Sequence, residues 1–287
     1  MTARTILQIS DTHLSRTHAY FQDNWDAFVD CVAEEKPDFV FVTGDMCFNG
    51  PGNPDDLAYA RGQLDRLAAP WRAIPGNHDI GDVPPDNRLK HPISAERRDA
   101  YRQHFGDEYW TEDFGAWRFI GLNAQLMGSG LPDEMEQIDF LQNALDGAGN
   151  RSLALLIHKP LFHAKVDEAN ETLATVFPEP RRLLLALCRA YRIKLVASGH
   201  RHAYRAQKMG RTQLVWAPAS AFVDTSKKDG TLRVLRRAGY VRYRFDGAAF
   251  THELVEPKRF ISHDMRNWMQ QAGSTTKLPP RPLNGAA

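Results

Sequence analysis

The sequence predicts an α/β fold built around packed β-sheets. Short apolar runs of β character alternate with segments of helical periodicity over the first two thirds of the 287 residues. Several runs are apolar throughout, as expected of strands that are covered on both faces. Beyond Gly199 the pattern changes to closely spaced strands typical of antiparallel hairpins. With 43% hydrophobic and 25% charged residues, the chain has the composition of a globular protein with a large core.

The first part of the chain contains three predicted strands, in the runs TILQIS, DFVFVT and PWRAI. A helix is expected over residues 24–36, with Asp23 or Asn24 as its cap, because such side chains accept the free N–H groups of a first turn. A second helix is expected to open at Pro54, followed by two aspartates that suit the positive end of the helix dipole. A third is expected over residues 94–105.

The alternation continues with strands in WRFIGLN, LALLI and IKLVAS, and with helices over residues 132–146 and 180–191. After these come predicted strands in AYRAQKMGRTQLVWA, LRVL, GYVRYRFDG and AFTHELV, with turns at Gly210 and at Asp246-Gly247. The sequence predicts one domain over residues 1–261. The polar, Pro-rich remainder, residues 262–287, is expected to be a mobile C-terminal extension.

Composition excludes several classes of function. The formal net charge of +1 gives no general reason to expect nucleic-acid or membrane binding. Three distant cysteines without a CxxC pair suggest neither a disulfide framework nor a zinc ribbon. The N-terminus lacks a signal-peptide pattern, and no apolar run is long enough to span a membrane. We therefore expect a cytoplasmic protein, and a homo-oligomer is compatible with the sequence.

Five apolar runs are each followed directly by side chains that bind metals. In open α/β sheets, the loops after such strands converge at one edge. Carboxylates, imidazoles and an amide oxygen without cysteine suit Zn, Mn or Fe. Seven candidates exceed one tetrahedral shell and favour two ions that share a carboxylate. They are Asp11, His13, Asp45, Asn77, His158, His200 and His202.

Each of these pieces also has a purely structural interpretation. An Asp-x-His after a strand is often a turn with a surface histidine, His158 is compatible with a buried core histidine, and the GHRH stretch with a solvated loop. The stretch AIPGNHDIGD is compatible with a metal site, a proton-transfer site or a simple turn. The order and placement of all five at strand ends favour a site.

The complete pattern D-x-H, G-D, G-N-H-D, H and G-H-x-H, from Asp11 to His202, resembles the signature of the calcineurin-like metallophosphoesterases. LQISDTHL and SGHRHAY are particularly similar to class III cyclic-nucleotide phosphodiesterases. The resemblance extends over roughly residues 4–256. It implies a four-layer α/β/β/α sandwich of two mixed sheets with a binuclear metal centre.

The resemblance also implies roles for the candidate residues. One ion would be bound by Asp11, His13 and His202, the other by Asn77, His158 and His200, with Asp45 as the bridge. His78 would not bind metal but would protonate the leaving group, oriented by Asp79. Two divalent or mixed-valence ions of Mn, Fe or Zn would generate hydroxide for attack on phosphorus. We expect a small phosphate ester as substrate.

The expected activity is phosphodiester hydrolysis, and the alternatives are a phosphomonoesterase, including one acting on phosphoproteins, or a non-catalytic scaffold of the same fold. Serine-elbow, P-loop and dinucleotide-binding motifs are absent from the sequence. The connection after Asp79 is longer than is common in class III enzymes, and both this connection and the stretch IHKPLF resemble phosphoprotein-phosphatase-like members of the superfamily. Lys159 stands where class III enzymes often have another histidine. Phe48 and Asn49 follow Asp45 closely enough to line a pocket, although turn residues are the simpler interpretation, and His18 fits no motif.

Overall fold

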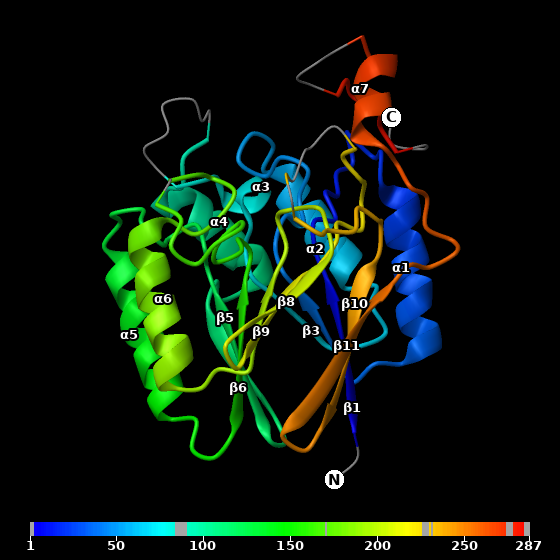
Figure 1. Cartoon of the computed structure of the whole chain (residues 1–287). Coiled ribbons are helices and arrows are strands. Elements are labelled where there is room, and N and C mark those ends of the chain that lie inside the picture. The colour runs from blue at the N-terminus through cyan, green and yellow to red at the C-terminus, as the bar shows by residue number, and fades with distance from the viewer. Residues whose placement is uncertain are drawn as a thin grey trace.

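The computed structural model describes residues 3–83, 91–169, 171–225, 230, 232–273 and 278–283. In these residues the chain forms two mixed β-sheets packed face to face, with helices on both outer faces (Figure 1). This arrangement confirms the predicted four-layer α/β/β/α sandwich. The loops that follow the parallel strands gather at one end of the sandwich, together with the C-terminal helix.

The first sheet has the strand order β11-β10-β1-β2-β3. Strands β1, β2 and β3 are parallel, whereas β10 and β11 run antiparallel to their neighbours. Each strand lies within a run that the sequence predicts, except that β1 begins one residue earlier, at Arg4. The strands are β1 (Arg4–Ile9), β2 (Phe39–Val42), β3 (Trp71–Ala73), β10 (Tyr240–Asp246) and β11 (Ala249–Val255).

The second sheet has the order β4-β5-β6-β7-β9-β8, in which β5, β6, β7 and β9 are parallel and the two edge strands are antiparallel. Strand β4 is absent from the sequence prediction because its polar, acidic segment lacks an apolar run. The strands are β4 (Trp110–Phe114), β5 (Trp117–Leu122), β6 (Ser152–Ile157), β7 (Leu195–Ser198), β8 (Arg205–Met209) and β9 (Thr212–Trp216). The predicted strand LRVL is wrong, since only Leu235 forms an isolated bridge, to Tyr204.

Seven helices occur in the described residues, and none of them is both long enough and apolar enough to cross a membrane. The five long helices coincide with predicted segments, whereas α3 and α7 were not predicted. The helices are α1 (Gln22–Glu35), α2 (Asp55–Leu64), α3 (Asn77–Ile80), α4 (Ala95–Phe105), α5 (Asp133–Asp146), α6 (Pro178–Ala190) and α7 (Met265–Gln271).

The predicted cap of the first helix is wrong. Helix α1 begins earlier than expected, with Phe21 at the cap position and no side-chain cap. Asn24 lies inside the helix and is fully buried, where its amide donates to the carbonyl oxygen of Ser220 at 2.8 Å and accepts from the N–H of Ile261 at 2.7 Å. These tertiary hydrogen bonds use the side chain that the sequence assigned to the cap.

The alternation of side chains along β1 separates the layers of the core. Leu7 and Ile9 pack against the helices that cover the first sheet, while Ile6 faces the second sheet. Gln8 also lies between the sheets, where its amide donates to the hydroxyl of Thr43 at 2.9 Å and to a carbonyl of β7 at 3.1 Å. The two sheets are thus joined by apolar packing and by a buried amide that also accepts a hydrogen bond from the hydroxyl of Tyr243 at 2.8 Å.

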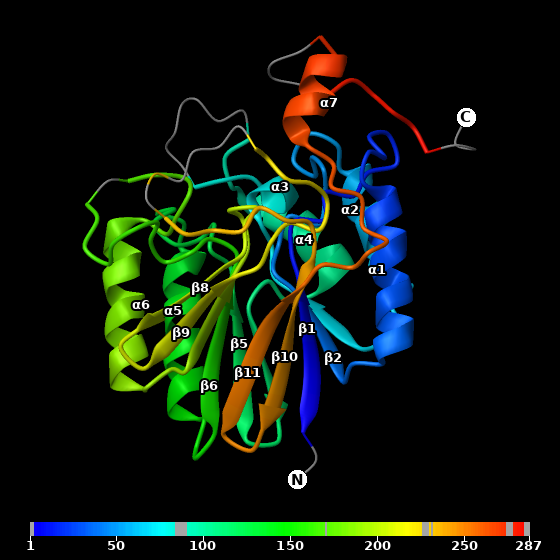
Figure 2. The same cartoon turned by 45° about the vertical axis from the view of Figure 1, so that its right-hand side comes forward.

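The C-terminal extension has structure where the chain is described. Helix α7 lies above the loop end of the sandwich (Figure 2). Leu278 is buried in a small apolar cluster with Tyr20, and the guanidinium of Arg281 stacks on the rings of Tyr20 at 5.4 Å and Trp268 at 4.8 Å. The division of the chain at residue 261 and the mobility of the extension stay predictions, and part of 262–287 lies outside the described residues.

A buried ion pair joins α4 to the segment that leads into β4, and a prediction about stability follows from it. The side chains of Arg98 and Glu108 are 1% and 2% exposed, and the guanidinium Nε donates to the carboxylate at 2.9 Å. Replacing Arg98 by Met leaves the buried carboxylate of Glu108 with Arg102 as its one remaining arginine partner among the described residues and removes the pairing of Arg98 with Asp133. We expect the free energy of unfolding, measured by urea denaturation, to fall by about 3–5 kcal/mol.

The matched control is the exposed pair of Arg66 and Asp26, whose side chains are 42% and 47% exposed. Arg66→Ala should change the same free energy by about 1 kcal/mol or less, because water screens such a pair. Equal effects of the two substitutions would contradict the assignment of Arg98 as a buried structural anchor.

Candidate metal centre

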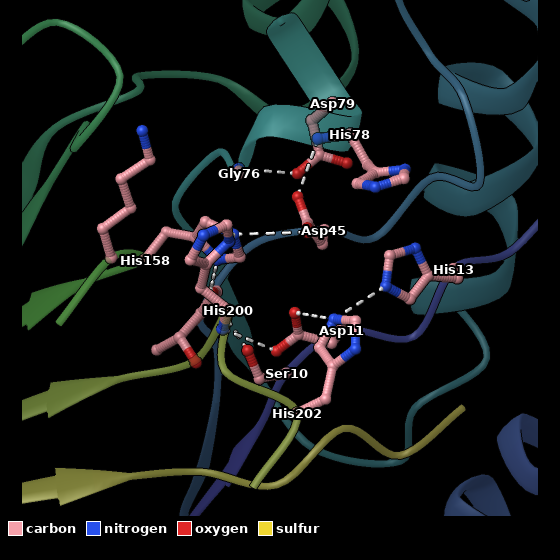
Figure 3. A network of polar contacts seen from close by, with 12 residues as sticks. Ser10, Asp11, His13, Asp45, Gly76, His78, Asp79, His158, His200 and His202 are labelled. Carbon is pink, nitrogen blue, oxygen red and sulfur yellow. Dashed lines mark hydrogen bonds and ion pairs between the residues drawn. The ribbon is translucent and has the colours of Figure 1, made fainter. Parts of the chain in front are cut away.

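The seven predicted ligand residues all follow strands that end at the loop end of the sandwich. Two groups of side chains form there, and in each group the potential ligand atoms lie within 4.8 Å of one another. Figure 3 shows these side chains pointing toward one another from both sheets. Asp45 belongs to both groups. The first group consists of Asp11, His13, Asp45 and His202, and the second of Asp45, His158 and His200.

Backbone strain is concentrated in the same residues. In the described chain, seven residues other than glycine have a positive φ angle, and five of them belong to these two groups. Each such residue costs roughly 1–3 kcal/mol, which a fold sustains where the conformation serves a function. The five are Asp11 (φ 54°), His13 (φ 45°), Asp45 (φ 54°), His200 (φ 66°) and His202 (φ 48°).

Two glycines allow the loops to approach one another closely. A Cβ atom on Gly76 would collide with the carboxylate of Asp45, and one on Gly199 would collide with the hydroxyl of Ser10. Both glycines directly precede predicted site residues. A side chain at either position would therefore push two of the converging loops apart.

The carboxylates have buried oxygen atoms that accept no hydrogen bond. Oδ1 of Asp11 lies 3.1 Å from Nε2 of His202, and Oδ2 of Asp45 lies 3.3 Å from Nε2 of His158. Neither oxygen has a hydrogen-bond partner among the described residues. A buried carboxylate oxygen that faces an imidazole nitrogen without a hydrogen bond has the surroundings of a metal ligand.

The hydrogen bonds of two imidazoles determine which nitrogen carries a lone pair. Nδ1 of His158 donates to the carbonyl of Thr43 at 2.7 Å, and Nε2 of His200 donates to the carbonyl of Leu173 at 2.9 Å. The remaining nitrogens, Nε2 of His158 and Nδ1 of His200, face each other at 3.2 Å. Two nitrogen lone pairs at this distance repel each other unless a proton or a metal cation lies between them. These carbonyls therefore orient the rings as in many metal sites.

The charges in the cluster determine where protons reside. Burial would raise the pKa of Asp45, but His158 and His78 outweigh burial and hold that pKa well below its usual range. Burial would lower the pKa of His158, but Asp45 outweighs it and raises the pKa to about 9. In the metal-free protein the protonated imidazole of His158 thus supplies the positive charge that balances the carboxylate of Asp45. A metal ion would take the place of the proton on His158.

Two other imidazoles of the cluster, those of His13 and His200, are held neutral. Burial, together with the neighbouring His78, lowers the pKa of His13 well below its usual value. Burial, together with His158, lowers the pKa of His200 in the same way. Nε2 of His13 lies 3.5 Å from Nε2 of His202. Neutral imidazole is the form that binds metals, so these side chains are in the required state.

Asn77 begins the one-turn helix α3, which follows β3. Its side-chain oxygen is buried and has no hydrogen-bond partner among the described residues. The next backbone N–H, that of His78, donates to Oδ1 of Asp45 at 2.8 Å. This hydrogen bond ties the loop to the shared carboxylate. Asn77 stays a predicted metal ligand, and its side-chain oxygen is available to bind an ion.

The predicted role of Asp79 in orienting His78 is wrong. Nδ1 of His78 donates to the carbonyl of Phe48 at 2.7 Å, so this backbone oxygen sets the direction of the ring. The carboxylate of Asp79 instead accepts the N–H groups of Gly76 at 2.8 Å and Cys47 at 2.9 Å. Asp79 therefore joins the loops after β2 and β3. Burial and Asp45 raise the pKa of Asp79 to about 6.

Several residues near the site were not assigned a role from the sequence. The ring of Phe222 packs against the imidazoles of His13 at 5.1 Å and His202 at 4.6 Å. The ring of His18 stacks on that of Phe48 at 4.8 Å. The sequence carries no signal for such contacts, because they join segments that are distant along the chain.

Lys159 follows His158 directly and is buried in an ion pair with Asp82, the residue that ends the GNHDIGD stretch. Burial lowers the pKa of Lys159 against the opposing effect of Asp82. The pair joins the loop after β6 to the loop after β3. Lys159 thus has a structural use at the position where a histidine is common in class III enzymes.

Two phosphoesterases are similar to this chain in sequence. Serine/threonine-protein phosphatase CPPED1 of Pongo abelii is 30% identical over 179 residues, which are 58% of this chain and 54% of that protein. The chain thus spans about half the length of this relative. The 3',5'-cyclic adenosine monophosphate phosphodiesterase CpdA of Pseudomonas aeruginosa is 26% identical over 228 residues, which are 75% of each chain.

The fold is also that of purple acid phosphatase PPD1 from yellow lupin. That structure has a TM-score of 0.66 and 16% identity, and the match covers 93% of this chain and 55% of the other. The sequence matches the family described as calcineurin-like phosphoesterase over residues 4–204, which is well over half of its length. The family's sequence pattern, its fold and the two groups of buried ligand atoms coincide in one molecule. This chain belongs to the calcineurin-like phosphoesterase family.

Proposed function

We propose that this protein is a two-metal phosphoesterase that hydrolyses phosphodiesters. The observation that carries the proposal is the position of Asp45, whose carboxylate belongs to both groups of buried ligand atoms. A shared carboxylate is the usual bridge between two ions. The unpartnered oxygen atoms of Asp11 and Asn77 and the opposed nitrogens of His158 and His200 support the same conclusion.

Each proposed ligand set combines residues from loops of both sheets. Nitrogen and oxygen ligands without sulfur suit Mn, Fe or Zn, and these are the proposed metals. When bound, such a pair neutralises phosphate charge and makes water acidic enough to act as the nucleophile at neutral pH. The first set is Asp11, His13 and His202, the second is Asn77, His158 and His200, and Asp45 joins them.

The protein's own proton donor in this proposal is His78. Its Nδ1–H is committed to the carbonyl of Phe48, which leaves Nε2 to hold the proton that the leaving oxygen requires. The ring of His78 lies beside that of His13, at 4.6 Å between centroids, and remains partly exposed. His78 is therefore close to the proposed metal ligands and accessible to substrate.

The match to the cyclic-AMP phosphodiesterase over three quarters of both chains favours a diester substrate, whereas the match to a protein phosphatase supports a monoester as the second candidate. We expect faster hydrolysis of bis-p-nitrophenyl phosphate than of p-nitrophenyl phosphate across added Mn, Fe, Zn and Co. Cyclic nucleotides, glycerophosphodiesters and phosphopeptides then extend the panel. Faster turnover of the monoester with every metal would overturn the diester proposal.

Metal binding should release protons from this site. Asp45 raises the pKa of His158 to about 9 in the metal-free protein, so this imidazole is protonated at pH 7 and must lose its proton to bind an ion. The apparent affinity for Zn or Mn should therefore rise as the pH increases from 6 toward about 9. Calorimetric titration of chelator-treated protein in buffers of different ionisation enthalpy measures the release. Metal binding without proton release would contradict this prediction.

The compartment and the assembly of the protein are further proposals. The three cysteines, Cys31, Cys47 and Cys188, are buried and unpaired. Free thiols are typical of reducing compartments, which supports the proposed cytoplasmic location. A homo-oligomer stays a prediction.

A further inference from the structure

A cavity of about 680 Å³ lies between α6 and the hairpin of β8 and β9, on the outer face of the second sheet. None of the proposed metal ligands lines it. Its size is within the range of small-molecule sites, which is about 300–1,000 Å³. The proposed phosphoesterase activity assigns no role to this cavity.

The cavity follows from the topology of the second sheet. The chain passes from β7 to β8 through a short connection, residues 199–204, that contains no helix. The helices α5 and α6 cover the part of the sheet formed by the strands that precede β8 in the chain. The strands β8 and β9 extend beyond α6 at the edge of the sheet (Figures 1 and 2). The outer face of this hairpin therefore has no helix of its own, and a hollow remains beside α6.

One wall of the cavity is a loop held in a defined shape. The carboxylate of Glu168 accepts the backbone N–H groups of His163 at 2.6 Å and Ala164 at 3.0 Å. Arg181, which is buried on α6, pairs with the same carboxylate at 3.3 Å. These contacts fix the loop against the helix, so the wall is built by the fold.

The charge around the cavity is strongly positive. Of the residues that the structure describes, five arginines line it, against the two carboxylates of Asp167 and Glu168, and Glu168 is committed to the loop and to Arg181. Among the residues that the structure describes, Arg182, Arg192 and Arg211 form no ion pair. Their guanidinium groups are available to an anion from outside the protein.

The part of the lining that lies between these charged groups, the floor of the cavity, is apolar. Leu185 and Cys188 contribute from α6, and Met209 contributes from the end of β8. Among the described residues no aromatic side chain lines the cavity, so the floor offers no aromatic ring on which a nucleobase could stack. The lining therefore matches a ligand with a flexible alkyl body rather than a nucleotide.

We propose that this cavity, defined by Arg182, Arg192, Arg211, Leu185 and Met209, binds a small organic anion with an aliphatic chain. The arginines bind the carboxylate or phosphate head, and the alkyl chain lies on the apolar floor. The site is separate from the proposed metal centre, so the proposal holds whether or not the hydrolase activity is found.

Calorimetric titration of the metal-loaded protein with decanoate tests the proposal. Decanoate contains no phosphate ester, so the protein cannot hydrolyse it as a substrate. We expect saturable binding, weaker binding of acetate and of decanol, and about a tenfold or greater loss of affinity in Arg192→Glu/Arg211→Glu. The matched control is Arg266→Glu, an exposed arginine on α7, which should bind decanoate like the unmodified protein.

A diazirine-labelled decanoate locates the site without any substitution. After irradiation, peptide mapping should find the label on α6 or on the β8–β9 hairpin. Labelling confined to the loops of the metal centre would overturn the proposal, as would equal affinity in the double variant and the control. Binding of acetate as tight as that of decanoate would exclude a role for the apolar floor.

Discussion

Asp45→Asn is expected to remove most of the bound metal and to lower turnover by more than about a hundredfold. Even residues that only orient metal ligands cost roughly 10- to 100-fold when they are replaced, and Asp45 is the proposed bridge. The substitution keeps the shape of the side chain. An asparagine oxygen can still accept the N–H of His78, which now donates to Oδ1 at 2.8 Å.

The change therefore removes charge rather than structure. An amide NH₂ in place of Oδ2 can donate to Nε2 of His158, which lies 3.3 Å from that oxygen. His158 would then no longer need its proton, because the carboxylate that raises its pKa is gone. We expect a folded protein in which the two ligand groups are no longer joined by a common anion.

Metal analysis together with steady-state kinetics measures the effect. The unmodified protein should hold about two ions per chain, as a two-metal site requires, and the variant should hold fewer than one. The matched control is Asp56→Asn. Asp56 is equally buried, but its carboxylate accepts the N–H of Asn49 at 3.1 Å and lies outside both ligand groups.

The control should keep both ions whatever its effect on stability. An Asp45→Asn protein with two ions and unchanged turnover would remove Asp45 as the bridge. Absence of metal from the unmodified protein under conditions of ample Mn, Fe and Zn would instead support the alternative of a non-catalytic scaffold.

Much of the fold was predictable because it depends on local apolar patterns. Strands β1, β2 and β3 coincide with short apolar runs, and the hairpin turn at Gly210 is marked by a glycine with φ of 61°. Strand β4 escaped prediction because it pairs at an edge, where polar side chains are tolerated. Asn24 was misread as a cap because its partners, the carbonyl of Ser220 and the N–H of Ile261, are distant in sequence.

The site could be predicted as a set of residue types at strand ends, but its internal contacts could not. The positions of Asp11 and His202 after parallel strands indicate that they meet. Nothing in the sequence indicates that the carbonyl of Phe48 orients His78 or that Asp79 bonds to backbone N–H groups. Backbone acceptors carry no signature, since every residue has a carbonyl group.

His78→Ala is expected to keep both metal ions and to lose turnover selectively with poor leaving groups. A positioned proton donor contributes about 10²- to 10⁴-fold to such reactions. In the structure His78 belongs to neither ligand group, and its backbone N–H, which survives the substitution, is what contacts Asp45. The metal centre therefore has no reason to disassemble when the imidazole is removed.

The leaving group provides the internal control for this prediction. p-Nitrophenolate leaves readily without a proton, whereas an alkoxide does not, so the variant should lose far more activity toward an alkyl phosphodiester than toward bis-p-nitrophenyl phosphate. His104→Ala, on α4 and outside both ligand groups, should leave both rates unchanged. If His78→Ala slowed the two substrates by the same factor, the imidazole would act in binding phosphate rather than in protonating the leaving oxygen, because only proton donation depends on the basicity of the group that departs.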